Sequence, residues 1–449
     1  MLVTSDLDAE GRAMAGMSVE PYREITFDKD GDGDSAQRDA LGRLGVTDLV
    51  VFAHGWNSSR SVATRLYDRF FGPFPGLLPA GARVGYAGVV WPSMMFTDEP
   101  VPDFARVAGS ARVAAAPTEP GLDAESRDAL VALFPERTGV IQRLARLLDE
   151  RPEDETAIRE FGALLRELTG ADGAGATAGD DEATPAFLFG DPVEVCAAFA
   201  DALESLEAAP PPQEPEGPGG RQELLGSRLK RLWKGAKEAL RQATYYTMKR
   251  RAGKVGERGL GPLLGELARS SPALRIHLVG HSMGARLVAF ALRGLPGGTR
   301  NVKSVTLLQG AFSHYAFAAS LPHDRGSAGA LRDMQRRVDG PVVACHSRHD
   351  TALGVIYPLA SRLARDSSSV AGLDRRWWAV GHSGVQGVPG TPSLTLDEAL
   401  RAGVAASGCV NVDAASVVRR GGPPSGAHSD ICHPELARVV IAAGRIGGG

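Results

Sequence analysis

The stretch that decides the fold is "LRIHLVGHSMGARLVAF", residues 274–290. An apolar run ends in "GHSMG", residues 280–284, and an amphipathic run follows it. A short apolar run rich in β-branched residues predicts a buried strand, and apolar side chains spaced by three and four residues predict a helix. Ser282 therefore stands between two glycines where a buried strand turns into a helix.

Other short apolar runs alternate with helical patterns such as "SVATRLYDRFF" along the chain. These runs are "DLVVFAHG" (48–55), "RVGYAGVVWPS" (83–93), "VKSVTLLQGAF" (302–312), "PVVACHSRHD" (341–350) and "CVNVDAASVV" (409–418). Nearly continuous apolar runs are typical of strands that are covered on both faces. Strand followed by helix, repeated, predicts an α/β fold with a mostly parallel sheet and helices on both faces.

Residues 94–240 interrupt this rhythm with helical patterns alone. The patterns are "AESRDALVALF" (124–134), "VIQRLARLLDER" (140–151), "ETAIREFGALLREL" (155–168) and "DPVEVCAAFADALESL" (191–206), the last with Asp191 as N-cap. The stretches "GADGAGATAGDDEA" (170–183) and "APPPQEPEGPGG" (209–220) have the composition of linkers. We therefore expect an N-terminal segment (1–47) and a main domain (48–93 and 241–449) that is split by a helical insertion, a cap or lid (94–240).

Composition sets broad limits. The 449 residues include 50 basic and 53 acidic ones, so the whole chain has no bias toward nucleic acid. Four cysteines without a CxxC pair indicate a reducing compartment. The first ten residues are acidic, and no run of about 18 apolar residues occurs in the chain. We expect a cytoplasmic protein without a membrane span.

The glycines of the central stretch suit a sharp strand-to-helix turn. Gly280 and Gly284 leave room for the turn, hold Ser282 in strained geometry and expose its hydroxyl at the edge of the sheet. The same turn, which also contains His281, brings the backbone N–H of Met283 beside that hydroxyl. The alternative is a tight turn of the same shape that carries no chemistry.

This GxSxG turn resembles the nucleophile elbow of the α/β-hydrolase superfamily, in particular bacterial serine hydrolases of unassigned substrate. The resemblance covers 48–93 and 241–449, where "WPS" (91–93) and "YYTMKRRAGKVGERGLGPLLGELARSSP" (245–272) look like a strand end and the helix after it. The insertion has no counterpart in compact members, whereas lipase lids more commonly follow a later strand.

The resemblance also implies how an oxyanion is held. His54, Gly55 and Trp56 match the His-Gly-x sequence that follows a strand of the superfamily, and the Trp56 amide would join that of Met283 in an oxyanion hole. Taken alone, a His-Gly pair at a strand end is a common turn.

The superfamily order is serine, acid, histidine. Asp350 follows the predicted strand 341–347, where the acid usually lies, although it could instead cap the next helix; Asp413 is the second choice. For the base, His428 lies between the last strand-like run and a C-terminal helix. His433 and His382 are the alternatives.

His428 also belongs to a group of metal-ligand residue types with Asp430, Cys432 and His433. Adjacent Cys432 and His433 are awkward as joint ligands, and no partner pair has zinc-site spacing elsewhere. We therefore expect neither a metal nor a cofactor.

The segment Arg221 to Arg251 is strongly basic. One helical face of it carries the apolar side chains of Leu225, Leu229, Leu232, Trp233, Ala236 and Leu240. A basic amphipathic helix either packs its apolar face on its own domain, which we favour, or makes peripheral contact with an anionic membrane.

Taken together, these patterns predict a serine hydrolase that cleaves a small-molecule carboxylic ester or thioester, or a lipid-like substrate, without a nucleic-acid partner. Ser282 would attack, His428 would relay the proton and Asp350 would orient His428. One alternative is a catalytically silent scaffold that binds a ligand or protein. Another is a lipase or phospholipase that acts on anionic membranes through the basic helix.

Overall fold

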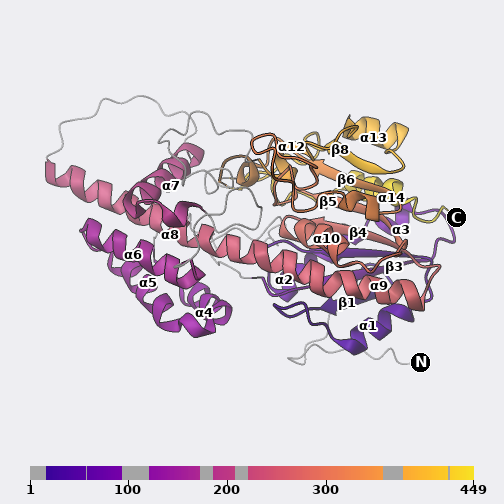
Figure 1. Ribbon diagram of the computed structural model, residues 1–449, viewed down its shortest axis with the longest axis horizontal. Coiled ribbons are helices and arrows are strands. Elements are labelled where there is room, and N and C mark those ends of the chain that lie inside the picture. Colours follow the sequence, from indigo (N-terminus) through magenta and orange to yellow (C-terminus); the bar gives the residue numbers. More distant parts are fainter. Residues whose placement is uncertain are drawn as a thin grey trace, which may run out of the picture.

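The computed structural model describes residues 17–56, 58–93, 121–171, 186–207, 221–356, 378–422 and 425–448. One eight-stranded sheet runs through the protein, all of its strands are parallel, and helices lie around it (Figure 1). The predicted α/β class with a mostly parallel sheet is confirmed. The residues 172–183 and 209–220, which carry the predicted linkers, lie outside the described part of the chain.

The strands are β1 (Tyr22–Thr26), β2 (Asp48–Ala53), β3 (Val84–Val90), β4 (Arg275–His281), β5 (Val302–Leu308), β6 (Pro341–His346), β7 (Ser393–Thr395) and β8 (Gly408–Asp413). The helices around them are α1 (Ser35–Gly42), α2 (Arg60–Phe71), α3 (Phe74–Leu77), α8 (Arg221–Val255), α9 (Gly261–Ser270), α10 (Met283–Gly294), α12 (Val380–Ser383), α13 (Leu396–Ala402) and α14 (Pro434–Gly444).

The central strands are buried because both faces of the sheet carry helices. In β2, Leu49, Val51 and Ala53 face the core shared with α8, α9 and α10. Val50 and Phe52 point the other way, into the core shared with α2, α3, α13 and α14. All six residues of β2 are buried, which explains its continuous apolar sequence.

The strand order β1-β3-β2-β4-β5-β6-β8-β7 reverses direction between β2 and β4. From β2 the chain goes outward to β3, then returns past β2 to β4 and continues outward through β5 and β6. In open parallel sheets, ligands bind beyond the carboxyl ends of the strands where the order reverses. The loop after β2 and the turn after β4 meet at this point.

The sequence patterns did not indicate the two edge strands. β1 buries only Ile25 of its five residues, and β7 is three residues long. An edge strand has a single neighbour and needs no apolar run, so its sequence carries little signal. β1 pairs with β3, so part of the segment 1–47 belongs to the sheet.

The connection from β3 to β4 contains the predicted helical segment. It holds α4 (Ala124–Leu133), α5 (Thr138–Glu150), α6 (Glu155–Thr169) and α7 (Pro192–Glu207), close to the predicted bounds. The side chain of Asp191 accepts the backbone N–H of Val193 at 2.8 Å, as expected of an N-cap. Helix α8 then runs without a break across residue 240, where we expected the insertion to end, and reaches the sheet through η3 (Gly256–Leu260) and α9.

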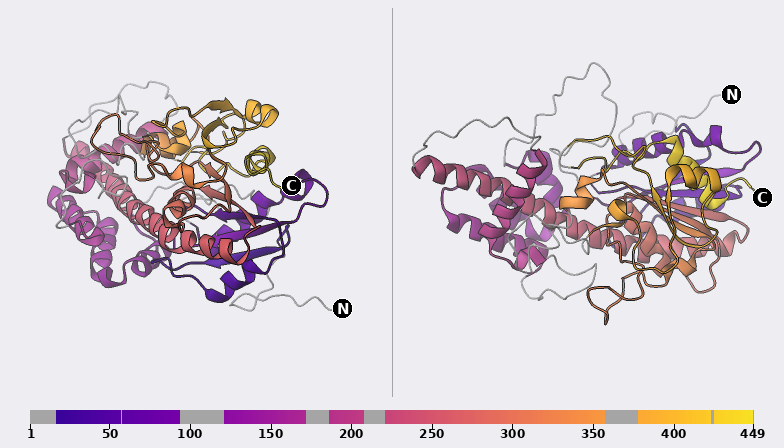
Figure 2. Two further views of the ribbon diagram at one scale, coloured as in Figure 1. Left: turned by 45° about the vertical axis from the view of Figure 1, so that its right-hand side comes forward. Right: turned by 90° about the horizontal axis from the view of Figure 1, so that it is seen from above.

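Figures 1 and 2 show α8 as one long helix that joins the α5, α6 and α7 group to the sheet. Its apolar face is buried inside the protein, including Leu232, Ala236 and Leu240. Trp233 is fully buried, its Nε1 donates to the carbonyl of Pro152 at 3.2 Å, and its ring meets Phe161 edge-on.

Several basic side chains of α8 form ion pairs with the neighbouring helices. Arg228 pairs with Glu155 at 3.1 Å, and Arg231 pairs with Glu204 at 3.0 Å. The side chain of Leu225 is not among those described. No helix within the described residues is long and apolar enough to cross a membrane. Contact of α8 with an anionic membrane stays a prediction.

The packing of Trp233 predicts a large loss of stability on truncation. Trp233→Ala should lower the free energy of unfolding by about 3–5 kcal/mol, because it empties a fully buried site and leaves the Pro152 carbonyl without its donor. Denaturant titration followed by circular dichroism measures this loss. Lys230→Ala, at an exposed position of the same helix, is the control and should change the value by less than about 0.5 kcal/mol. A small effect of Trp233→Ala would mean that this face of α8 is not packed in solution.

Candidate active site

Ser282 sits in a strained turn between β4 and α10. Its φ is +56° and its ψ is −118°, which residues with a side chain rarely adopt. A β-carbon on Gly280 would lie 2.3 Å from the carbonyl oxygen of Gly284, and one on Gly284 would lie 2.0 Å from that of Ala53. Both positions therefore require glycine, and the turn has the shape that the GxSxG pattern predicts.

A chain of hydrogen bonds leads away from the Ser282 hydroxyl. Ser282 Oγ lies 2.8 Å from His428 Nε2, and His428 Nδ1 lies 2.7 Å from Asp350 Oδ2. A carboxylate only accepts, so Nδ1 carries the imidazole proton and Nε2 offers its lone pair to the serine. The structure thus brings together the three side chains that we singled out, in the order serine, histidine, carboxylate.

Asp350 makes contacts that would suit both of the roles that we considered for it. Its Oδ1 accepts the backbone N–H of Leu353 at 3.0 Å, which is a capping contact. Its Oδ2 accepts from His428 and also from Nε2 of Gln309 at 3.2 Å. Sequence reasoning missed Gln309, although a polar residue directly after the apolar run 302–308 was an available signal.

His281, next to the serine, fixes the position of His428. Its Nε2 donates to the backbone carbonyl of His428 at 2.9 Å. Burial lowers the pKa of His281 to about 3, so its imidazole is neutral near pH 7. The histidine of the GHSMG motif therefore holds the backbone of His428 and carries no charge of its own.

The loop after β2 lies directly against Ser282. A β-carbon on Gly55 would be 2.9 Å from the β-carbon of Ser282, so Gly55 allows the close approach. His54 Nδ1 donates to the carbonyl of Gly55 at 2.8 Å, and its ring stacks on Trp91 with centroids 5.5 Å apart. Burial lowers the pKa of His54 to about 4, which keeps this ring neutral. Trp56 follows Gly55 in this loop.

The alternative site residues make other contacts. His433 Nε2 donates to Asp430 at 2.8 Å, and the other oxygen of Asp430 accepts the backbone N–H groups of residues 419 and 420. His382 Nδ1 donates to the backbone carbonyl of Asp350 at 3.2 Å, and Asp413 accepts the backbone N–H of residue 415. Within the described residues, no group of three or more His, Cys, Asp or Glu side chains is arranged to hold a metal.

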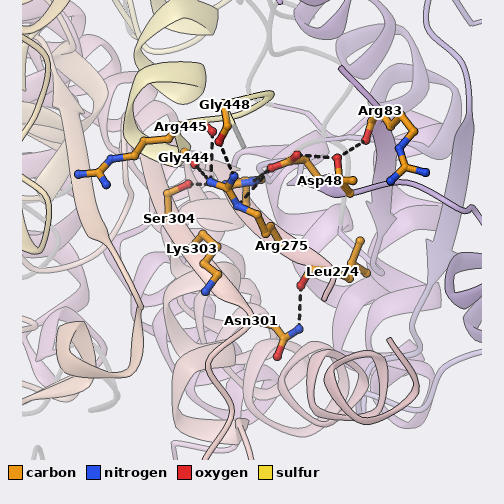
Figure 3. Close-up of polar contacts among 12 residues, drawn as sticks. Asp48, Arg83, Leu274, Arg275, Asn301, Lys303, Ser304, Gly444, Arg445 and Gly448 are labelled. Carbon is orange, nitrogen blue, oxygen red and sulfur yellow. Dashed lines mark hydrogen bonds and ion pairs between the residues drawn. The ribbon is translucent and has the colours of Figure 1, made fainter. Parts of the chain in front are cut away.

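A second chain of hydrogen bonds runs from Ser304 through His277 to Asp48, near the amino ends of the central strands. Solvent does not reach this chain of hydrogen bonds, because Ser304 and His277 are 0% exposed. Figure 3 shows Arg275 beside Asp48, reaching the backbone carbonyls of Gly444, Arg445 and Gly448. A cavity of about 1200 Å³ lies beside this network, and Arg275, which lines it, already makes the contacts just described. This network fastens the end of α14 to the sheet.

Because several histidines are buried, we expect the free energy of unfolding to fall as the pH is lowered. Burial lowers the pKa of His54, His281 and His314, and that of His314 falls to about 3 against an ordinary 6.5. Below about pH 6.5 the unfolded chain therefore binds more protons, and each such histidine lowers the free energy of unfolding by about 1.4 kcal/mol per pH unit down to its folded pKa.

His314→Leu isolates one of these groups without changing Ser282, His428 or Asp350. Between pH 6 and 4 it should flatten the pH dependence of the unfolding free energy by about 1.4 kcal/mol per pH unit. Denaturant midpoints across that range provide the measurement. An unaltered slope would mean that His314 takes up its proton as easily in the folded protein as in the unfolded chain.

No family model, curated protein or solved structure matches this chain. A functional assignment therefore rests on the geometry around Ser282, His428 and Asp350.

Proposed function

We propose that this protein is a serine hydrolase of the α/β-hydrolase type that cleaves a carboxylic ester or thioester. The observation that carries the proposal is the hydrogen-bonded chain from Ser282 through His428 to Asp350, which begins at a strained serine. Its position at the carboxyl ends of β2 and β4, where the strand order reverses, supports the proposal. A strained, nearly buried serine is typical of functional sites rather than of simple turns.

In the proposed reaction, His428 Nε2 takes the hydroxyl proton of Ser282 as Oγ bonds to the carbonyl carbon of the substrate. Asp350 holds the proton on Nδ1 and stabilises the imidazolium that forms. The tetrahedral intermediate then collapses, the carbonyl carbon loses its bond to the leaving oxygen or sulfur, and His428 returns the proton to it. Water then bonds to the carbonyl carbon of the acyl group as His428 takes a proton from it, the bond to Ser282 Oγ breaks, and His428 returns the proton to Oγ as the carboxylic acid leaves.

The backbone amides of Met283 and Trp56 are the proposed donors to the oxyanion. Met283 is the first residue of α10, and the first amides of a helix have no acceptor within it. Gly55 allows the loop that carries Trp56 to press against Ser282. In the proposal, one amide from the turn after β4 and one from the loop after β2 converge on one side of the serine hydroxyl.

A fluorophosphonate probe tests the proposal without knowledge of the substrate. Ser282 Oγ should bond to phosphorus as fluoride leaves and the hydroxyl proton passes to His428. Labelling should vanish in Ser282→Ala and fall by about 10⁴-fold or more in His428→Ala. Asp350→Asn should retain more reactivity than His428→Ala, because Asp350 makes no bond to the probe.

Ser304→Ala is the matched control. Ser304 also belongs to a serine, histidine and aspartate chain, but it is fully buried and should not react. Labelling that persists in folded Ser282→Ala, or that never occurs in the wild type, would refute the proposal and favour a silent scaffold that binds a ligand or partner.

A further inference from the structure

Gln309 lies beside Ser282 at the carboxyl end of the next strand. The backbone N–H of Ser282 donates to the carbonyl of Leu308 at 3.0 Å, and that of Gln309 donates to the carbonyl of Cys345 at 3.2 Å. The Gln309 side chain is 1% exposed. Its Nε2 reaches Asp350 Oδ2, the same oxygen that accepts from His428. The Gln309 amide therefore contacts the Asp350 carboxylate inside the protein, away from solvent.

The backbone of Gln309 is strained. Its φ is +48°, a value that the β-carbon of an L residue disfavours. Among the described residues, the others with positive φ that are not glycine are Arg151, Ser282, Asp333 and Arg445. Arg151, Asp333 and Arg445 lie at helix ends and are not fully buried. Ser282 and Gln309 share burial, strain and a place directly after adjacent central strands.

The segment at α12 holds Gln309 in this conformation. A β-carbon on Gly381 would lie 2.4 Å from the carbonyl carbon of Gln309, so the two backbones are in contact. The N–H of Gly381 donates to the carbonyl of Gly310 at 2.9 Å, and its own carbonyl accepts from Ser347 at 3.0 Å. The strained residue is thus fixed between β5 and the loop that carries Asp350.

The side chain of Gln309 is also unfavourable for stability. Its Oε1 is buried and has no hydrogen-bond partner among the described residues. A buried acceptor without a partner is costly, and an apolar side chain of similar size avoids that cost. Strain and an unsatisfied polar atom in one residue suggest that the residue is retained for what its Nε2 does.

We propose that Gln309 is a positioning residue that holds the Asp350 carboxylate in register with His428. The amide directs Oδ2 toward Nδ1 of His428, while the backbone of Leu353 holds Oδ1. Because Gln309 and His428 both donate to Oδ2, the negative charge of Asp350 is partly stabilised by Gln309. Asp350 therefore stabilises the imidazolium of His428 less than it would without Gln309. This inference rests on the proposed function of the same site.

The pH dependence of fluorophosphonate labelling tests the role of Gln309. Gln309→Met removes the donor at similar volume, and Gln309→Asn keeps an amide that is too short to reach Oδ2. In both variants the full charge of Asp350 acts on His428 and favours its protonated form. The acidic limb of the labelling rate should therefore move to higher pH by about 0.5–1 unit. The maximal rate should fall by about tenfold because the carboxylate is free to turn.

Thr306→Val is the matched control. Thr306 lies on β5 three residues before Gln309, is equally buried, and its hydroxyl has no hydrogen-bond partner among the described residues. This variant removes a buried polar group from the same strand without touching Asp350, so its acidic limb should stay at the wild-type pH. Circular dichroism establishes which variants fold, and either Gln309 variant alone decides the question if the other does not fold.

The inference would be overturned if a folded Gln309 variant kept the acidic limb of its labelling rate at the wild-type pH. This holds even if the labelling rate falls, because a purely structural role lowers the rate equally at every pH. An equal shift in Thr306→Val would also overturn the inference. These results leave the proposed function intact as long as wild-type protein is labelled at Ser282. Loss of wild-type labelling, in contrast, would remove the proposed function and this inference with it.

Discussion

The site depends on direct contact between the backbones at the ends of β2 and β4. Gly284 in the first turn of α10 packs against the carbonyl of Ala53, and Gly55 packs against Ser282 itself. A side chain at either glycine would push the two strand ends apart. Ser282 has its positive φ at this contact, and the loop that holds Trp56 follows Gly55 next to the serine. The reversal of strand order between β2 and β4 creates the space in which these two segments meet.

The rest of the site is assembled from elements that are far apart in the sequence. Asp350 follows β6 and His428 precedes α14, yet neutral His281 from the serine turn donates to the backbone of His428. Each member of the hydrogen-bonded chain is therefore held by a second contact from a neighbouring segment. A side chain that is held in this way loses little conformational entropy when it reacts, which is the condition for an efficient proton relay.

The sequence was most informative where local patterns coincide with strong constraints. The six central strands, Ser282 and the glycines around it were predictable because buried parallel strands need apolar runs and a sharp turn needs glycine. The edge strands β1 and β7 were not, since each has a single neighbour and little buried surface. Gln309 escaped notice because its role comes from a contact with Asp350, 41 residues away, which no local pattern encodes. The place of His428 between the last strand-like run and the C-terminal helix already favoured it over His433 and His382, and in the structure it is His428 that lies against Ser282 Oγ.

Helix α8 links the helical group of α5, α6 and α7 to the sheet that carries the site. Tyr245 on this helix donates to the carbonyl of Ala311, and its ring meets Trp56 edge-on with centroids 5.5 Å apart. Helix α8 is thus in physical contact with the proposed oxyanion loop. We propose that Ser282 is a nucleophile whose oxyanion is held by the amides of Met283 and Trp56. A crystal structure of the phosphonylated protein tests it most directly. We expect phosphorus bonded to Ser282 Oγ, with the phosphonyl oxygen within hydrogen-bond distance of both amides. An adduct on another residue, or an oxygen turned away from both amides, would contradict this role of Ser282.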